Sequence, residues 1–158
     1  PLDHSVATRA PSATVEDARA AVDAAAKAFP VWSAMGPGER RALLMKASHA
    51  LEAKGEAFAK AMATETGASG IWAGFNVHLA ADMLLEAAAL TTQINGQVIP
   101  SNVPGNVAMA VRQPAGVVLG IAPWNAPVIL GVRAIATPLA CGNTVVLKGS
   151  EISPATHG

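Results

Sequence analysis

Residues 116–151 read GVVLGIAPWNAPVILGVRAIATPLACGNTVVLKGSE, and this stretch decides the fold. The near-continuous apolar run 117–122 predicts a strand that is buried on both faces of a parallel sheet. Pro127 suits the first turn of a helix that ends near Cys141, and residues 144–148 predict a second buried strand. Together they predict a β-α-β unit with parallel strands. Because open parallel sheets bind ligands beyond the carboxyl ends of their strands, we expect a site at those ends.

Polar residues follow both predicted strands. After the first comes Pro123-Trp124-Asn125, where the Asn125 amide could donate a hydrogen bond to an oxygen that gains negative charge. Spacing by itself favours a simpler role for Asn125, the capping of the following helix. After the second strand, Lys148 and Glu151 could hydrogen-bond ribose hydroxyls, or could form only a weak surface ion pair. No glycine-rich dinucleotide motif and no Walker lysine motif is present, so spacing leaves the cofactor open.

The first part of the chain has the apolar spacing of helices. After an expected loop over residues 1–13, we expect helices from Thr14 to Pro30, from about Pro37 to Lys54, from about Glu56 to Thr66 and from about Ser69 to Ile94. Thr14 and Asp17 form a variant of the capping box at the start of the first helix. Gly67 suits a left-handed position after the third helix.

A hairpin is expected between the helical part and the β-α-β unit. Its strands are the short β-like runs 97–101 and 106–113, which flank the turn residues 102–105. A hairpin of two strands is marginal in water, so this one should pack against something else. The fold class is therefore α/β: N-terminal helices, a β-hairpin arm and the first β-α-β unit of a Rossmann-like parallel sheet. Since two strands cannot bury the faces of such a sheet, we expect a truncated fold whose last helix begins at Ser153-Pro154.

Charge and composition exclude several functions. Eleven basic and eleven acidic side chains give a formal net charge of zero, so nothing favours nucleic acid or an anionic membrane as a partner. One cysteine leaves no disulfide framework, and the longest apolar run is too short to span a bilayer. The start of the chain lacks the apolar core of a secretion signal. The four histidines lack the spacing of metal ligands. These features predict a cytoplasmic protein without a bound metal.

Several segments resemble the aldehyde dehydrogenase superfamily in order and spacing: Arg112-Gln113-Pro114, Pro123-Trp124-Asn125, Leu139–Asn143 and Val145–Glu151. The combination of Pro-Trp-Asn with Lys-x-x-Glu is highly specific, and weaker similarity covers almost the whole chain. Three further segments are similar to the vanillin and salicylaldehyde dehydrogenases within that superfamily, namely residues 67–69 (GAS), 72–77 (WAGFNV) and 99–105 (IPSNVPG).

The resemblance implies an enzyme that oxidises aromatic aldehydes to carboxylic acids with NAD or NADP, through a cysteine thiohemiacetal. It implies that Asn125 donates to the oxyanion of that thiohemiacetal. Cofactor contacts are implied for Ile121, Ala122, Pro123 and Trp124 on the nicotinamide ribose side, and for Lys148, Ser150 and Glu151 at the adenosine ribose. Glu151 favours NAD, because a 2′-phosphate would meet its carboxylate. Gly149 departs from the proline of many members, which loosens this turn.

Substrate contacts follow partly from helix geometry. One helix face begins beside Asn125 and carries Ala126, Ile129, Leu130 and Arg133. In the family this face lines the aldehyde tunnel, and Arg133 would meet a ring oxygen of the substrate or form an interdomain ion pair. Trp72, with Phe75 and Asn76 one turn on, would form the opposite wall, although a buried tryptophan is more often part of a core.

The resemblance also implies that this chain is an N-terminal fragment. Cys141 is expected to be a small buried residue and not the nucleophile, since the motifs of the family's catalytic cysteine and glutamate are absent. Residues 1–95 would be the helical part of the cofactor-binding domain, 96–115 an oligomerisation arm of a homodimer or homotetramer, and 116–158 the truncated first unit of the dinucleotide-binding sheet. The fragment alone should be inactive. Two alternatives are a non-catalytic nucleotide-binding or assembly module and an incomplete helical domain without activity.

Overall fold

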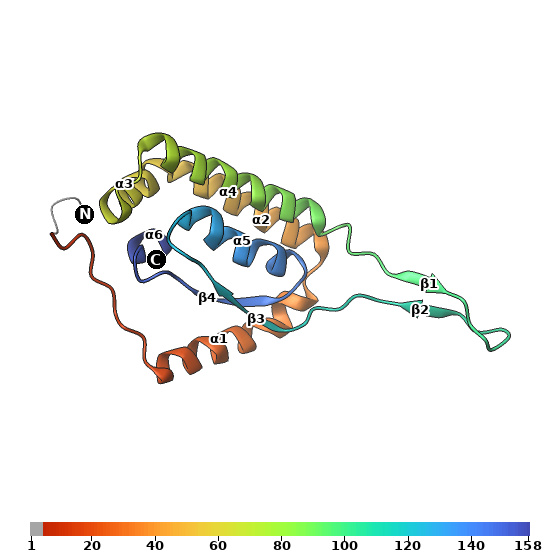
Figure 1. Ribbon diagram of the computed structural model, residues 1–158. Coiled ribbons are helices and arrows are strands. Elements are labelled where there is room, and N and C mark those ends of the chain that lie inside the picture. The colour runs from red at the N-terminus through yellow and green to blue at the C-terminus, as the bar shows by residue number, and fades with distance from the viewer. Residues whose placement is uncertain (1–4) are drawn as a thin grey trace.

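The computed structural model describes residues 5–158 as layers of helices around a small parallel sheet (Figure 1). Helices α2, α3 and α4 lie together on one side of α5, the sheet of β3 and β4 lies beyond α5, and α1 lies across the far side of the sheet. In chain order the elements are α1 (Val15–Ala34), α2 (Pro37–Ala53), α3 (Gly55–Thr66), α4 (Gly70–Leu90), β1 (Gln97–Ile99), β2 (Ala108–Ala110), β3 (Val117–Ile121), α5 (Pro127–Ala140), β4 (Thr144–Lys148) and α6 (Pro154–His157). The expected α/β class and the order of elements are confirmed.

Strands β3 and β4 are parallel neighbours joined by α5, as the β-α-β pattern predicts. Their register runs from Val117 opposite Thr144 to Ile121 opposite Lys148. Asn143 aligns the starts of both strands, because its Oδ1 accepts from the backbone amides of Ala115 (2.6 Å) and Gly116 (3.0 Å). Both strands consequently end at the same edge of the sheet.

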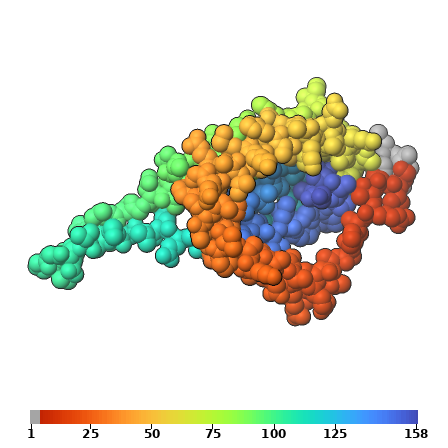
Figure 2. Space-filling model, turned by 180° about the vertical axis from the view of Figure 1, so that it is seen from behind, coloured from red at the N-terminus to blue at the C-terminus, as the bar shows by residue number. Residues whose placement is uncertain are grey.

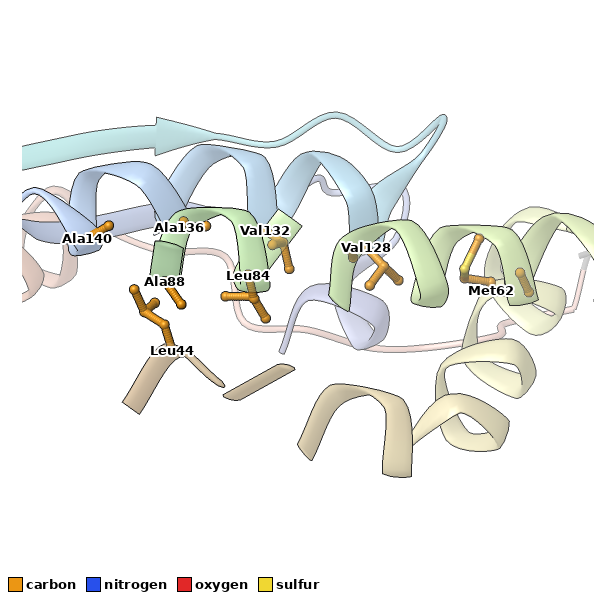
Figure 3. Packing of buried hydrophobic residues seen from close by; sticks show 11 residues of the cluster. Leu44, Met62, Leu84, Ala88, Val128, Val132, Ala136 and Ala140 are labelled. Carbon is orange, nitrogen blue, oxygen red and sulfur yellow. The ribbon is translucent and has the colours of Figure 1, made fainter. Parts of the chain in front are cut away.

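The hydrophobic core lies mainly between α4 and α5, with α2 and α3 closing it (Figure 3). Large side chains such as Leu84 and Met62 fill it, while alanines let the helices approach closely. The buried cluster comprises Leu44, Met62, Ala73, Ala80, Leu84, Ala87, Ala88, Val128, Val132, Ala136 and Ala140. Arg40 joins α2 to the end of α5, since its Nε donates to the carbonyl of Ala140 at 3.2 Å and its Nη1 donates to the carbonyl of Met35. A guanidinium there suits the negative end of the α5 dipole.

The expectation that β3 is buried on both faces is wrong for this chain. Helix α5 covers the face that carries Gly120, where a Cβ would lie 3.0 Å from the Cβ of Ala134. On the opposite face Leu119 and Ile121 remain 63% and 67% exposed. The reason is that α1 contacts mainly β4, where Thr144 Oγ1 donates to the carbonyl of Ala25 at 2.9 Å. Leu119 and Ile121 are therefore largely uncovered by the described residues.

Two helix ends also differ from expectation. Helix α1 continues through Pro30 to Ala34, and its last turn is held by the Trp32 indole, whose Nε1 donates to the carbonyl of Leu139 at 3.0 Å. This contact with the end of α5 helps to keep residues 31–34 helical although Pro30 disfavours continuation of the helix. Helix α4 ends at Leu90 and not near Ile94, because the Thr91 amide and hydroxyl both turn back to the carbonyl of Ala88.

Local signals at other helix ends are confirmed. Thr14 and Asp17 form the expected capping box of α1, in which each side chain accepts from the other's backbone amide. Gly67 follows α3 with a left-handed φ of +69°.

The hairpin projects away from the rest of the molecule (Figures 1 and 2). Strands β1 and β2 are shorter than expected, three residues each, and pair antiparallel with Val98 opposite Met109. Val98 is 76% exposed and Met109 is 66% exposed. No helix among residues 5–158 combines the length and apolar character needed to cross a membrane.

Candidate active site

The carboxyl ends of β3 and β4 bring the two polar segments of the sequence together. Ile121 pairs with Lys148 in the sheet, and the next amide, that of Ala122, donates to the carbonyl of Lys148 at 3.0 Å. Residues 123–127, here called the first loop, therefore lie beside residues 148–153, here called the second loop. This edge is where a parallel sheet of this kind binds its ligand.

Asn125 lies in the middle of the first loop and is open to solvent. The residue is exposed, and the N-cap of α5 is Ala126 without a side-chain hydrogen bond. The helix-capping role for Asn125, which spacing favours, is therefore wrong. Among residues 5–158 the Asn125 side chain has no hydrogen-bond partner, whereas its backbone carbonyl is held by Trp72 Nε1 at 3.3 Å. A fixed backbone with an uncommitted amide suits donation to a bound oxygen atom.

Trp72 stands at the start of α4, against the first loop. Ser69 Oγ accepts from its backbone amide, and its ring stacks on Phe75 with centroids 5.6 Å apart. The indole N–H is engaged with Asn125, so Trp72, which is 41% exposed, has only its apolar ring surface left for other contacts. Asn76 is fully buried one turn further on, where its Nδ2 donates to the carbonyl of Trp72 at 3.0 Å. Asn76 Oδ1 has no partner among the described residues.

Lys148 and Glu151 form an exposed ion pair at the start of the second loop. Lys148 Nζ lies 2.8 Å from Glu151 Oε2. The hydrogen bond from Lys148, supported by a backbone hydrogen bond and the ammonium charge, holds the pKa of the Glu151 carboxyl below its usual value. One cation and one carboxylate, open to solvent at a strand end, fit a pair of ribose hydroxyls, which both donate and accept hydrogen bonds.

The remaining expected cofactor residues differ in exposure. Ile121, Pro123 and Trp124 are exposed along the same edge, whereas Ala122 is only 2% exposed and Ser150 only 6%. On α5 the expected substrate residues also divide: Ala126 and Ile129 are buried, Leu130 is half-buried and Arg133 is exposed. The structure thus gathers Asn125, Trp72, Lys148 and Glu151 around one edge but does not expose every residue of the expected set.

Two residues that the sequence analysis missed hold the second loop and α6. Glu65, at the end of α3, accepts hydrogen bonds from the backbone amides of Ala155 (2.7 Å) and Thr156 (2.9 Å) and from the Thr156 hydroxyl (2.6 Å). His157 accepts from the amide of Ser150. Glu65 lies 91 residues from Thr156, so no local pattern could reveal its role.

Cys141 and the histidines do not form a second centre. Cys141 is expected to be buried but is only half-buried. It lies just after the last residue of α5, as its C-cap. His78 forms an exposed pair with Asp82 on α4, with His78 Nε2 lying 3.5 Å from Asp82 Oδ2. Within residues 5–158 no three His, Cys, Asp or Glu side chains are grouped so that they could hold a metal ion.

The β-α-β edge and its Pro-Trp-Asn loop define the class of this protein. The chain matches the aldehyde dehydrogenase family over residues 1–157 and therefore belongs to that family.

Within this family, the chain is similar to dehydrogenases of aromatic aldehydes. A vanillin dehydrogenase of Pseudomonas sp. (strain HR199 / DSM 7063) is 68% identical over 157 residues, covering 99% of this chain and 32% of the relative. A salicylaldehyde dehydrogenase of Pseudomonas putida is 52% identical over 157 residues, again covering 99% of this chain and 32% of the relative. This chain thus spans about a third of the length of the curated relatives that it matches.

Solved structures agree with the fold. The crystal structure of a salicylaldehyde dehydrogenase from Pseudomonas putida G7, complexed with salicylaldehyde, superposes with a TM-score of 0.90 at 54% identity. That alignment covers 92% of this chain and 30% of the other. An NAD-dependent benzaldehyde dehydrogenase from Corynebacterium glutamicum gives a TM-score of 0.88 at 36% identity, covering 92% and 32%. The expected aldehyde dehydrogenase fold is confirmed as a partial one.

Proposed function

We propose that this chain is the N-terminal part of a cytoplasmic NAD(P)-dependent aldehyde dehydrogenase that oxidises aromatic aldehydes to carboxylic acids. The observation that carries the proposal is the exposed Asn125 amide, which has no partner among residues 5–158 while its backbone is held by Trp72. The 68% identity to a vanillin dehydrogenase and the 52% identity to a salicylaldehyde dehydrogenase support the substrate class.

Asn125 acts on the oxygen of the aldehyde. Its Nδ2 donates a hydrogen bond to the carbonyl oxygen, and this bond strengthens when a nucleophile adds to the carbonyl carbon and the oxygen becomes negative. The nucleophilic cysteine and the glutamate base lie outside this chain. The Trp72–Asn125 hydrogen bond orients the loop before substrate arrives, which reduces the cost of reorganisation during the reaction.

The cofactor binds along the edge of the sheet. NAD supplies the hydride acceptor when it is bound. Lys148 and Glu151 hold the adenosine ribose, and the exposed Ile121, Pro123 and Trp124 flank the nicotinamide ribose side. Glu151 favours NAD over NADP, since its carboxylate would repel a 2′-phosphate.

The aromatic ring of the substrate lies against Trp72 and the α5 face that begins beside Asn125. The exposed part of Trp72, stacked on Phe75, offers an apolar wall, and stacked rings favour aromatic ligands. Arg133 is exposed on α5 and meets a ring hydroxyl or methoxyl oxygen. Ala126, Ile129, Leu130 and Asn76 support this wall from beneath, in keeping with their burial or half-burial.

The hairpin is an oligomerisation arm of a homodimer or homotetramer. Its support is the exposure of Val98 and Met109, which lie on paired strands far from the core. An unpaired strand edge and apolar side chains together suit addition to the sheet of a second copy.

The decisive test is Asn125→Ala in the full-length protein, assayed with vanillin and NAD. Removing one oxyanion donor should lower kcat by about 10²- to 10³-fold, because the bond is strongest in the transition state. Isothermal titration should find unchanged NAD affinity. Asn95→Ala, at an exposed asparagine outside both loops, is the matched control and should leave kcat unaltered. An Asn125→Ala enzyme with the wild-type kcat would contradict the assignment. The 158-residue chain alone should show no turnover.

A further inference from the structure

His157 connects the two loops of the active-site edge. Its Nδ1 accepts from the backbone amide of Ser150, in the second loop, at 3.1 Å. Its Nε2 lies 3.0 Å from the backbone carbonyl oxygen of Pro127, which closes the first loop two residues after Asn125. One imidazole therefore bridges the strand end that carries Lys148 and Glu151 to the strand end that carries Asn125.

The partners determine the tautomer of this ring. A backbone N–H can only donate, so Nδ1 carries no proton, and a backbone carbonyl can only accept, so the proton is on Nε2. In this neutral form both ring nitrogens are engaged. Ser153 Oγ lies 3.4 Å from Nδ1 and can add a weaker donor to the same atom.

The ring is held closely on its other sides. A Cβ on Gly131 would lie 3.3 Å from His157 Cδ2, and a Cβ on Gly149 would lie 2.9 Å from His157 Cβ. The absence of side chains at both glycines lets α6 approach the second loop and α5 this closely. Glu65 fixes the same short helix from the α3 side through the amides of Ala155 and Thr156. The position of the imidazole is thus determined by groups from α3, α5 and the second loop.

We propose that His157, as the Nε2–H tautomer, is a positioning residue that couples the cofactor loop to the oxyanion loop. It touches neither ligand itself. Through Ser150 it sets the backbone beside Lys148 and Glu151, and through Pro127 it sets the start of α5 beside Asn125. This inference rests on the proposed function, because it concerns how that one site is assembled.

Two conservative substitutions separate the halves of the bridge in the full-length protein. His157→Asn places an amide oxygen near the position of Nδ1, so it keeps the acceptor for Ser150 but loses the donor to Pro127. His157→Gln places an amide nitrogen near the position of Nε2, so it keeps the donor to Pro127 but loses the acceptor for Ser150. A purely structural role of the ring would not distinguish these two variants.

The expected results are opposite for the two variants. His157→Gln should raise the Kd for NAD by about fivefold with kcat for vanillin little changed, the scale of one lost hydrogen bond. His157→Asn should lower kcat by about fivefold with the Kd for NAD little changed, for the same reason. His157→Ala should show both defects. His49→Ala, at an exposed histidine of α2, is the control and should show neither.

A spectroscopic measurement tests the bridge without any turnover. Long-range ¹H–¹⁵N correlation of the full-length protein should find His157 protonated at Nε2 and bare at Nδ1. A proton on Nδ1 would overturn the bridge. In an enzyme that oxidises vanillin, a His157→Ala variant with wild-type kcat and NAD affinity would overturn the coupling role alone. Wild-type protein that neither binds NAD nor oxidises vanillin would overturn the proposed function and this role with it, while the tautomer would still decide whether the bridge exists.

Discussion

The strand-end loops and the hairpin arm differ in how the rest of the chain holds them. The loops are held by residues distant in sequence: Trp72 reaches Asn125 across 53 positions, and Glu65 reaches Thr156 across 91. In the arm, β1 pairs with β2 and, among residues 5–158, with no other strand. Contacts within this chain thus hold the loops in place, whereas the exposed apolar side chains of the arm have no covering surface among the described residues.

Burial shows a similar contrast between apolar residues of the helical core and of the arm. Leu84 in α4 is 5% exposed, whereas Val98 in β1 is 76% exposed. Both belong to regular elements with apolar neighbours in sequence. What differs is the partner, since α5 covers Leu84 and nothing among residues 5–158 covers Val98. An apolar residue in a regular element therefore indicates that some surface packs against it. It does not indicate whether that surface belongs to the same chain.

Truncating one residue in the helical core and one in the arm should show the largest difference. Leu84→Ala should lower the free energy of unfolding by about 2–5 kcal/mol, because it removes buried methyl groups and leaves a cavity. Val98→Ala, measured by denaturant titration in protein dilute enough to be monomeric, should change it by less than about 0.5 kcal/mol. Equal losses of unfolding free energy in the two variants would contradict the proposed difference between core and arm.

Removing the charge that holds α6 should have a smaller effect. Glu65→Gln keeps the shape of the side chain but places an amide group among three donors, so it should cost about 2 kcal/mol of stability. Thermal unfolding of the full-length protein measures this cost. Glu86→Gln, at an exposed glutamate of α4, is the matched control and should have almost no effect. A neutral Glu65→Gln would show that the contact does not help to hold the loop.

Charging the arm should alter assembly and leave the monomer intact. Val98→Asp should weaken self-association by at least about tenfold, since an interface would have to bury an unpaired carboxylate. Light scattering over a range of protein concentrations measures the effect. Val6→Asp is the control, because Val6 is 66% exposed and lies outside the arm. If both variants associate equally, the hairpin is not the interface.

The smallest effect concerns the exposed pair of the second loop. Lys148→Met should raise the pKa of the Glu151 carboxyl toward its usual value, since the hydrogen bond from Lys148 is the main cause of its lowering. The sign follows from the lowered pKa: the pair is intact above the ordinary glutamate range and is lost as the pH falls through the lowered value. Carboxyl ¹³C titration without NAD detects the change. Lys60→Met, at an exposed lysine of α3, should leave the Glu151 titration curve unchanged.

The sequence alone determined features that depend on near neighbours. The capping box of α1, the left-handed Gly67 and the β-α-β order each arise from residues close along the chain. Steric and hydrogen-bonding preferences act over a few residues, so a linear pattern carries them. The motif around Asn125 likewise indicates the family, and the match to the family over residues 1–157 confirms it.

Only the tertiary structure decided how these parts are fixed in place. It showed that Asn125 does not cap α5, that one face of β3 is uncovered, and that Glu65 and His157 hold the second loop. Each of these depends on which distant group occupies the space beside a side chain. Hydrogen bonds and burial are decided by that proximity, and sequence spacing does not contain it.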